Sequence, residues 1–203
     1  MKFVPLPQSF YEPSAEVVAP LLLGHWLVRN TPNGPSGGII VETEAYLKDD
    51  PACHASRVQT KRNAAMFGPP GRSYVYLIYG YHFCFNTVCC AEGIAEAVLI
   101  RAIEPAFGED FMHQQRPVAK SLNLTNGPAK LSSALKIQRE LDAINLCDAA
   151  SPLFVARNPD VKLFCKERGP VIQTKRIGIT KAAELPLRFY LEGSLFVSKR
   201  AAK

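Results

Sequence analysis

The chain has 203 residues, a length typical of one large domain or two small ones. Hydrophobic residues make up 47% and charged residues 21% of it, which is the balance of an ordinary globular protein. This composition excludes a disordered chain, a collagen-like fibre and a coiled coil. Pro, Gly or a charge interrupts every apolar run before the ~20 residues of a membrane span. Because the first ten residues also lack a signal peptide's apolar stretch, we expect a cytoplasmic or nucleoid-associated protein.

The chain is basic, with 24 Lys and Arg against 18 Asp and Glu and a net charge of +6. Such an excess of positive charge suits a phosphate-rich partner, but many ordinary enzymes carry as much. Charge alone therefore does not decide whether the protein binds nucleic acid. The six cysteines show no C-x-x-C spacing, which predicts reduced and mostly buried thiols. We expect no metal site, since no four convergent ligands stand out.

The first predicted elements are a helix over 15–23 and two strands over 25–29 and 39–46. The segment 30–38 is rich in Asn, Pro and Gly and predicts a turn, so the two strands are expected to form a hairpin. A polar loop over 49–71 follows, and loops of this length in a compact domain are usually functional or disordered.

The middle of the chain predicts three strands and two amphipathic helices, with short strands in the remainder up to residue 198. The strands are expected at 73–78, 83–89 and 97–103, and the helices at 108–115 and 128–135. No linker divides the chain. We therefore predict a single domain over 1–203 of mixed α/β (α+β) class, with a largely antiparallel curved β-sheet flanked by helices and a protruding β-hairpin.

Two carboxylates stand out in the second predicted strand. Glu42 and Glu44 are two residues apart, which puts them on one strand face about 7 Å apart. A solvent-exposed strand edge is the simpler interpretation. The sharper one is a general base beside a second carboxylate that modulates its pKa. Glycosidases use carboxylate pairs at such distances, so sugar hydrolysis is also open.

Aromatic residues crowd the hairpin that follows. Tyr74 and Tyr76 share one strand face, and cross-strand packing in a core explains Phe83 and Phe85. Tyr79, at the tip, buries nothing internally. A large aromatic side chain there suggests a wedge for a partner such as a base step.

Several longer motifs follow one another along residues 10–198. They are VETEAY at 41–46, HAS at 54–56, KRNAAMFGPPG at 61–71, YVYLIYGYHFCFN at 74–86, VLIRAIEP at 98–105, NGPAKL at 126–131, RIGI at 176–179 and LPLRFYLEGSLFVS at 185–198. In this order the chain resembles the alkyladenine (3-methyladenine) DNA glycosylase family. The resemblance implies one mixed α/β domain and a base-excision enzyme without a metal or redox cofactor.

The resemblance also implies a role for each matching residue. Glu44 matches the general base that activates the attacking water, and Arg101 an arginine beside that water and carboxylate. The walls, floor and edge of the base pocket match Tyr46, His54, Tyr76 and Asn86. Tyr79 matches the residue inserted into the minor groove. Further contacts with DNA are expected from Tyr74, Arg62, Asn63, Lys130 and Arg176.

The expected reaction follows from these roles. A glycosidic bond inside a duplex is inaccessible, so the nucleotide has to be flipped out. A ring-alkylated base is cationic and is attracted by aromatic faces. Since no lysine nucleophile is evident near Glu44, we expect attack by water without strand cleavage. The expected partner is double-stranded DNA with an alkylated, deaminated or etheno purine, and the enzyme is expected to act as a monomer without an obligate protein partner.

Two rival interpretations were weighed. A helix-hairpin-helix glycosylase would need a second glycine near Gly178 and an Asp about twenty residues later, and no Asp follows Asp160. A non-catalytic nucleic-acid binding module would use the basic and aromatic residues alone. Glu44 separates this module from an enzyme, because a pure binder has no use for a carboxylate where phosphates approach.

Overall fold

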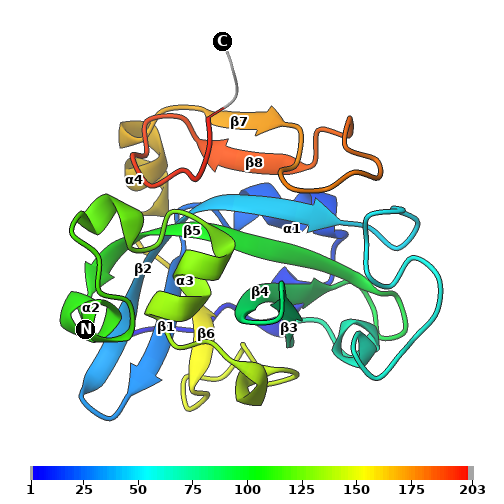
Figure 1. Ribbon diagram of the computed structural model, residues 1–203, viewed down its shortest axis with the longest axis horizontal. Coiled ribbons are helices and arrows are strands. Elements are labelled where there is room, and N and C mark those ends of the chain that lie inside the picture. The colour runs from blue at the N-terminus through cyan, green and yellow to red at the C-terminus, as the bar shows by residue number, and fades with distance from the viewer. Residues whose placement is uncertain (1, 201–203) are drawn as a thin grey trace.

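The computed structural model describes residues 2–200, which form an eight-stranded sheet with helices packed around it (Figure 1). The strands are β1 Trp26–Thr31, β2 Gly34–Tyr46, β3 Ser73–Ile78, β4 His82–Cys89, β5 Glu96–Phe107, β6 Leu153–Ala156, β7 Val171–Thr174 and β8 Arg188–Leu191. The α-helices are α1 Ala15–Leu21, α2 Glu109–Gln115, α3 Pro128–Ala134 and α4 Val161–Glu167. Short 3-10 helices lie at η1 Gln8–Phe10, η2 Ala64–Phe67, η3 Ser121–Asn123 and η4 Arg139–Leu141. The predicted α+β class with a curved antiparallel sheet is confirmed.

Strand β2 is the centre of the sheet. The strand order is β3-β4-β5-β2-β1-β6, and each of these neighbours pairs antiparallel. With 13 residues, β2 pairs with β5 along one edge, while its other edge pairs with β1 in its first half and with β8 in its second half. The C-terminal strands are therefore joined directly to the strand that carries the two glutamates.

One row of residues crosses the sheet from the hairpin to the C-terminal strands. Successive partners in this row, from β3 through β4, β5 and β2 to β8, are Tyr74, Asn86, Leu99, Glu44 and Arg188. Directly paired residues point to the same face of a sheet, and so do residues two apart on a strand. This face therefore collects aromatic, amide, carboxylate and guanidinium groups that lie between residues 44 and 188 of the sequence.

The opposite face of β2 is packed against helix α1. Val41 and Ala45 are completely buried there, and the Thr43 hydroxyl donates a 2.9 Å hydrogen bond to the Ala19 carbonyl. Buried side chains of α1, β4 and β5 complete the core on this side: Ala15, Val18, Phe85, Val98 and Ile100. The face opposite α1 carries the row of aromatic, amide and carboxylate groups.

A β-bulge in β5 sets the direction of one side chain. The pairs Thr43–Ile100 and Glu42–Ala102 leave Arg101 as the extra residue between them. Bulges re-aim a side chain and are common beside active sites. Here the bulge directs the guanidinium of Arg101 toward the glutamates of β2.

The predicted turn at 30–38 was too long, and β5 runs past Pro105. The actual connection between β1 and β2 is residues 32–33, and Pro105 pairs with Gly38. The sequence misleads because its glycines allow close strand contact here: a Cβ at Gly37 or Gly38 would lie 2.0 Å from a neighbouring carbonyl oxygen. In β-sheets, glycine often marks such a close backbone approach.

The prediction of short strands alone in the last third was wrong. Helix α4 lies between β6 and β7. Earlier in the chain, the predicted polar loop over 49–71 also contains a short helix, η2. Asp160 stands at the start of α4 without a side-chain capping bond, and no residue of α4 is buried. The sequence offers Asp160 as an N-cap residue, but the helix buries no residue and so shows no clear apolar stripe.

All six cysteines are free thiols in the described part of the chain, and four of them are buried. Among residues 2–200 no helix has the length and apolarity needed to cross a membrane.

The buried His25 predicts acid sensitivity of the fold. Burial, reinforced by Arg157, lowers the pKa of His25 from 6.5 to about 4, while its Nδ1 accepts a hydrogen bond from the Asn158 amide. Between pH 6.5 and 4, His25 therefore binds a proton in the unfolded chain but not in the folded one. The free energy of unfolding should fall as pH drops through this range. The loss attributable to His25 is roughly 2–3 kcal/mol.

Urea unfolding of wild type and His25→Gln at pH 7.5, 5.5 and 4.5 tests this. The wild type should lose more stability between the first and last pH than the variant does. Equal losses in both proteins would contradict the assignment to His25.

Candidate active site

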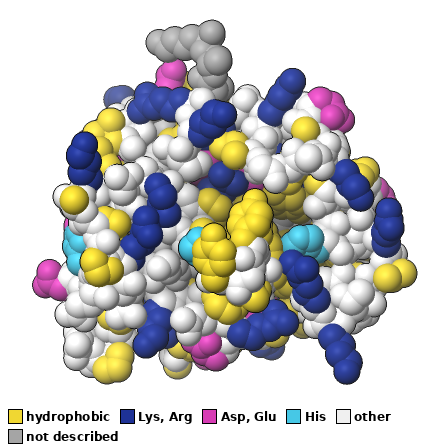
Figure 2. All heavy atoms as spheres, in the orientation of Figure 1, with side chains coloured by type: hydrophobic (Ala, Val, Ile, Leu, Met, Phe, Trp, Pro, Cys, Tyr) yellow, Lys and Arg dark blue, Asp and Glu magenta, His cyan; other side chains and the backbone are white. Residues whose placement is uncertain are grey.

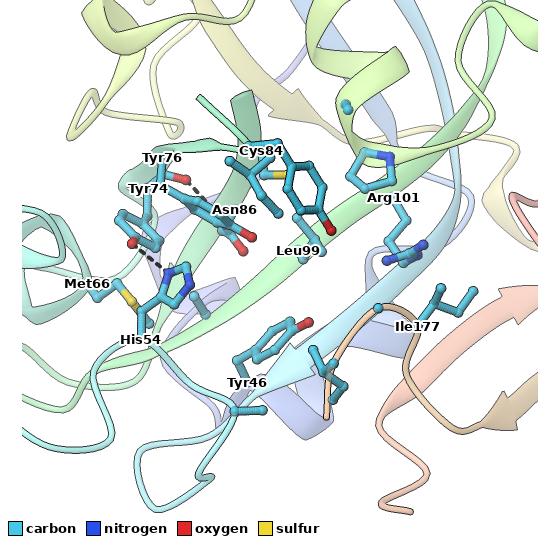
Figure 3. A pocket seen from close by; sticks show the side chains of 18 residues that line it. Tyr46, His54, Met66, Tyr74, Tyr76, Cys84, Asn86, Leu99, Arg101 and Ile177 are labelled. Carbon is cyan, nitrogen blue, oxygen red and sulfur yellow. Dashed lines mark hydrogen bonds between the residues drawn. The ribbon is translucent and has the colours of Figure 1, made fainter. Parts of the chain in front are cut away.

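A pocket of about 290 Å³ opens on the free face of the sheet (Figure 3). Its walls come from β2, β3, β4 and β5, from the loop that carries His54, from α3 and from the segment before β8. The lining residues are Tyr46, Ala52, His54, Met66, Tyr74, Tyr76, Ile78, Tyr79, Cys84, Asn86, Ala97, Leu99, Arg101, Pro128, Ala129, Ile177, Gly178 and Ile179. This volume lies near the lower end of the ~300–1,000 Å³ of small-ligand sites, which suits one flat ring system.

Three rings form one wall of the pocket. Tyr74 and Tyr76 stack at 5.4 Å between centroids, and His54 meets Tyr76 edge-on at 4.5 Å. The Tyr74 hydroxyl lies 2.9 Å from Nδ1 of His54. The predicted shared face of the two tyrosines is confirmed, and the histidine is fixed by its contact with one of them.

The rings of this pocket are kept electrically neutral. Burial raises the pKa of Tyr46, Tyr74 and Tyr76 well above the ordinary value, so they stay phenols. Burial, and then the nearby Arg62, lower the pKa of His54 below its ordinary value. At neutral pH the wall therefore presents neutral π-faces, which attract a cationic base by ~0.5–2 kcal/mol each.

Glu44 lies directly behind the pocket wall and is completely buried. Its Oε2 accepts a 2.9 Å hydrogen bond from the Tyr46 hydroxyl. Its Oε1 accepts a 2.8 Å bond from the Ile177 amide and lies 3.2 Å from Nη1 of Arg101. All three partners line the pocket, so the carboxylate is within one side-chain layer of anything bound there.

Asn86 joins the pocket floor to the hairpin. It is buried, pairs with Tyr74 in the ladder, and its side-chain amide donates a 3.0 Å hydrogen bond to the Tyr74 carbonyl. This bond fixes the side chain at the pocket wall; that Asn86 restricts which bases enter stays a prediction.

Asn63, expected to contact DNA, is buried inside its loop instead. Its Nδ2 donates to the carbonyls of His54 and Val58, and its Oδ1 accepts from the amide and hydroxyl of Thr60. With every hydrogen-bonding group used within the loop, Asn63 holds the loop conformation that presents His54. The expected direct contact with DNA is corrected accordingly.

Arg176, also expected to contact DNA, has a fully buried side chain. It forms an ion pair with Asp50, donates to the Ala45 carbonyl at 3.0 Å, and stacks its guanidinium 4.7 Å from the Tyr46 ring centroid. The arginine thus ties the segment before β8 to the pocket wall. Because no phosphate can reach a buried guanidinium, the prediction is corrected to a structural contact.

The hairpin tip projects from the protein. Tyr79 is 74% exposed and has a φ of 53°, followed by Gly80 at 79°. Positive φ is uncommon for a residue with a bulky side chain and is found at functional sites when surrounding structure maintains it. Arg62 is also exposed, with its guanidinium 5.8 Å from the Tyr76 ring and one nitrogen bonded to the Leu77 carbonyl.

Basic side chains surround this region. Figure 2 shows Lys and Arg over the face drawn, around a central group of hydrophobic side chains above β3 and β4. Lys130 on α3 donates a 2.7 Å hydrogen bond to Asn126 and is half-buried next to the pocket-lining Ala129. The positive charges can neutralise phosphates on both sides of the pocket.

Several pocket residues were missed by the sequence interpretation. The most consequential is Ile177, whose backbone amide binds Glu44. The others are Ala52, Met66, Ile78, Cys84, Ala97, Leu99, Pro128, Ala129, Gly178 and Ile179. The motif containing Ile177 was visible, but a backbone donor has no side-chain signature. Alternation along β4 and β5 could have identified Cys84 and Leu99, which are two residues from predicted site residues.

Comparison with known proteins agrees with this geometry. Residues 9–195 match the family described as "Methylpurine-DNA glycosylase (MPG)". The chain is 48% identical over 197 residues to a "Putative 3-methyladenine DNA glycosylase" of Methanoculleus marisnigri, covering 96% of this chain and 99% of that protein. Proteins of the same name from Francisella tularensis and Carboxydothermus hydrogenoformans are 47% and 45% identical, over 88% and 96% of this chain and 91% and 99% of their own length.

The fold, the pocket and these similarities define a DNA glycosylase, a hydrolase that cleaves N-glycosyl bonds in DNA repair. The non-catalytic alternative is thereby excluded. The chain belongs to the methylpurine-DNA glycosylase family.

The buried position of Arg176 gives a test of its structural role. Arg176→Met should lower the free energy of unfolding by about 3–5 kcal/mol, because it leaves the buried Asp50 carboxylate unpaired. Lys175→Met changes an exposed neighbour of equal charge and should leave stability nearly unaltered. Chemical denaturation of both variants provides the comparison. Two equally stable variants would place Arg176 at the surface and contradict the structure.

Proposed function

We propose that the enzyme hydrolyses the N-glycosyl bond of a damaged purine flipped out of duplex DNA, with a water molecule activated by Glu44. The observation that carries the proposal is a buried carboxylate directly behind a neutral aromatic pocket of purine size. An aromatic pocket binds a flat base, and a carboxylate serves both a developing sugar cation and the proton of an attacking water.

Glu44 has the capacity to accept a water molecule. A carboxylate offers about four lone-pair positions. Oε1 accepts a hydrogen bond from the Ile177 amide and pairs with the Arg101 guanidinium, whereas among the described residues Oε2 accepts a hydrogen bond from the Tyr46 hydroxyl alone. We assign the base function to Oε2, with the other contacts fixing the carboxylate in the orientation that faces the pocket.

The pocket favours a cationic leaving base. Alkylation of a purine ring nitrogen gives the base a positive charge and weakens its glycosyl bond, so that departure leaves a neutral purine and oxocarbenium character on the sugar. The faces of Tyr46, Tyr76 and neutral His54 suit the cation before departure. The charge of Glu44 then stabilises the sugar. We therefore propose alkylated purines as the main substrates, in line with the 3-methyladenine in the relatives' names.

Water is proposed as the only nucleophile. Among the described residues that line the pocket none is a lysine. A lysine amine is what a glycosylase needs to form a Schiff base with the sugar and to cleave the strand. We further propose that the enzyme acts on double-stranded DNA as a monomer without a protein partner.

Tyr79 is proposed to hold the flipped state. Its exposed ring lies at the mouth of the pocket and can enter the space that the extruded nucleotide leaves. Unstacking a base costs a few kcal/mol, and less for a mispaired or damaged one. An inserted ring restores part of the lost stacking and lowers the free energy of the extruded state.

Glu44→Gln is the direct test of the base. The amide keeps the size of the side chain but cannot take a proton, so single-turnover release of 7-methylguanine from duplex DNA should fall at least a thousandfold. Binding to the same duplex should persist. Glu92→Gln, an exposed carboxylate on another segment, is the matched control and should retain wild-type release. Release at a near-normal rate by Glu44→Gln would refute the assignment.

Tyr79→Ala tests the wedge. The variant should lose more activity on a lesion paired in a duplex than on one opposite a gap or in a single strand, because only the paired lesion needs costly extrusion. His54→Ala, which alters the pocket itself, should lower release by similar factors on every substrate. Single-turnover rates and melting curves for both variants distinguish a wedge from a residue that only stabilises the fold. An equal loss of Tyr79→Ala activity on all substrates at unchanged stability would exclude a wedge.

A further inference from the structure

Four charged side chains form a closed cluster under the pocket. Glu42 and Glu44 of β2 have side chains that are 0% exposed, and those of Arg101 and Arg188 are 7% and 3% exposed. The cluster contains two negative and two positive charges and is neutral as a whole. Buried charges are tolerated in proteins when they are paired and hydrogen-bonded, and an imbalance in such a cluster is costly.

Glu42 is the most heavily bonded member of the cluster. Its Oε1 accepts from Nε of Arg101 at 2.8 Å, Nε of Arg188 at 2.7 Å and the Ser198 hydroxyl at 2.8 Å. Its Oε2 accepts from the Ser198 amide at 2.7 Å. Burial alone would raise the pKa of Glu42, but the two arginines and these bonds hold it below the ordinary value. Glu42 is therefore saturated with donors and is not free to act on a substrate.

Arg101 is shared unequally between the two glutamates. Its well-aligned Nε hydrogen bond goes to Glu42, whereas Nη1 lies at an ion-pair distance of 3.2 Å from Glu44. Its Nη2 donates to the Ser198 hydroxyl at 3.2 Å, which fixes the guanidinium plane from the side opposite the pocket. Arg101 is thus hydrogen-bonded to Glu42 and Ser198 and ion-paired with Glu44.

We infer that Glu42 is a positioning residue, which retains Arg101 and Arg188 so that Glu44 keeps a single guanidinium partner, Arg101, and remains a competent base. The inference rests on the proposed role of Glu44. Without the charge of Glu42, two guanidinium groups would face a single carboxylate. Arg101 would then turn its donors onto Glu44, and a carboxylate held by two cations is a weaker base.

The C-terminal segment completes this arrangement. Ser198 contributes both its amide and its hydroxyl to Glu42, and Arg188 also donates to the Lys199 carbonyl. Strand β8 and the segment behind it therefore close the cluster on the side away from the pocket. This explains why a carboxylate on β2 depends on residues about 150 positions later.

The expected signature is a pair of opposite pH shifts. The charged and titratable groups that face Glu44 come from five segments: Glu42 and Tyr46 on β2, Arg101 on β5, Cys84 on β4, Arg188 on β8 and Arg176 before β8. Removing the negative charge of Glu42 should move the acidic limb of the pH–rate profile to lower pH. Removing the positive charge of Arg188 should move it to higher pH.

Single-turnover release of 7-methylguanine from duplex DNA, measured from pH 3.5 to 9, tests this with Glu42→Gln, Arg188→Gln and the double variant. This cationic lesion is chosen because the purine leaves without being protonated first. The acidic limb of the pH–rate profile then reports the protonation of the general base. Glu42→Gln should also lose at least tenfold in rate at neutral pH. The double variant restores neutrality and should return the limb close to that of wild type. Melting curves for each protein are recorded alongside.

The outcomes separate positioning from a purely structural role. Limbs that stay in place while melting temperatures fall, or limbs that move in the same direction in both single variants, would overturn the inference. If Glu42→Gln does not fold, Arg188→Gln and the neutral double variant still give the predicted shift and its reversal. Glu44→Gln is measured in parallel. If this variant remains active, the proposed base itself is wrong. If it is inactive while the acidic limb of Glu42→Gln stays in place, only the positioning role is rejected.

Discussion

The burial of two carboxylates against two guanidinium groups is the constraint on which this structure depends. A charge can stay in the interior only if opposite charges and hydrogen bonds surround it. The bulge at Arg101, the short pairing of β2 with β8, and the return of the chain at Ser198 each supply one of those partners. Once they are in place, Glu44 lies behind the pocket with its orientation fixed before any substrate arrives, and preorganised charge of this kind is a large term in catalysis.

The sheet and the chemistry of its free face were predictable from the sequence to a large extent. Alternation along the strands placed Tyr74 and Tyr76 together, and the resemblance to a known family pointed to Glu44 and Arg101 before any coordinates. The structure brings Tyr74, Tyr76 and Arg101 to one pocket, with Glu44 buried directly behind its wall. The alternation of side chains along a strand and the residues within each motif carry this information, because both are set by residues close together in the sequence.

Contacts between distant segments were not predictable in the same way. Arg176 and Asn63 look like surface residues in the sequence, since they stand in polar and basic stretches, yet both are buried by partners that only the fold brings near. The amide of Ile177 has no side-chain signal. Helix α4 lacks a side-chain capping bond and a buried stripe. In each case the deciding contact is long-range, and local propensity gives way to tertiary packing.

The damaged base and its sugar should lie at defined positions in the pocket, and a crystal structure of a complex with DNA tests these positions most directly. The protein would be bound to a duplex containing a damaged purine on a 2′-fluoro sugar, which resists cleavage of the glycosyl bond. The account predicts the purine between Tyr46, Tyr76 and His54, with C1′ facing a water that is hydrogen-bonded to Oε2 of Glu44. A purine still stacked in the helix, or a sugar turned away from Glu44, would contradict it.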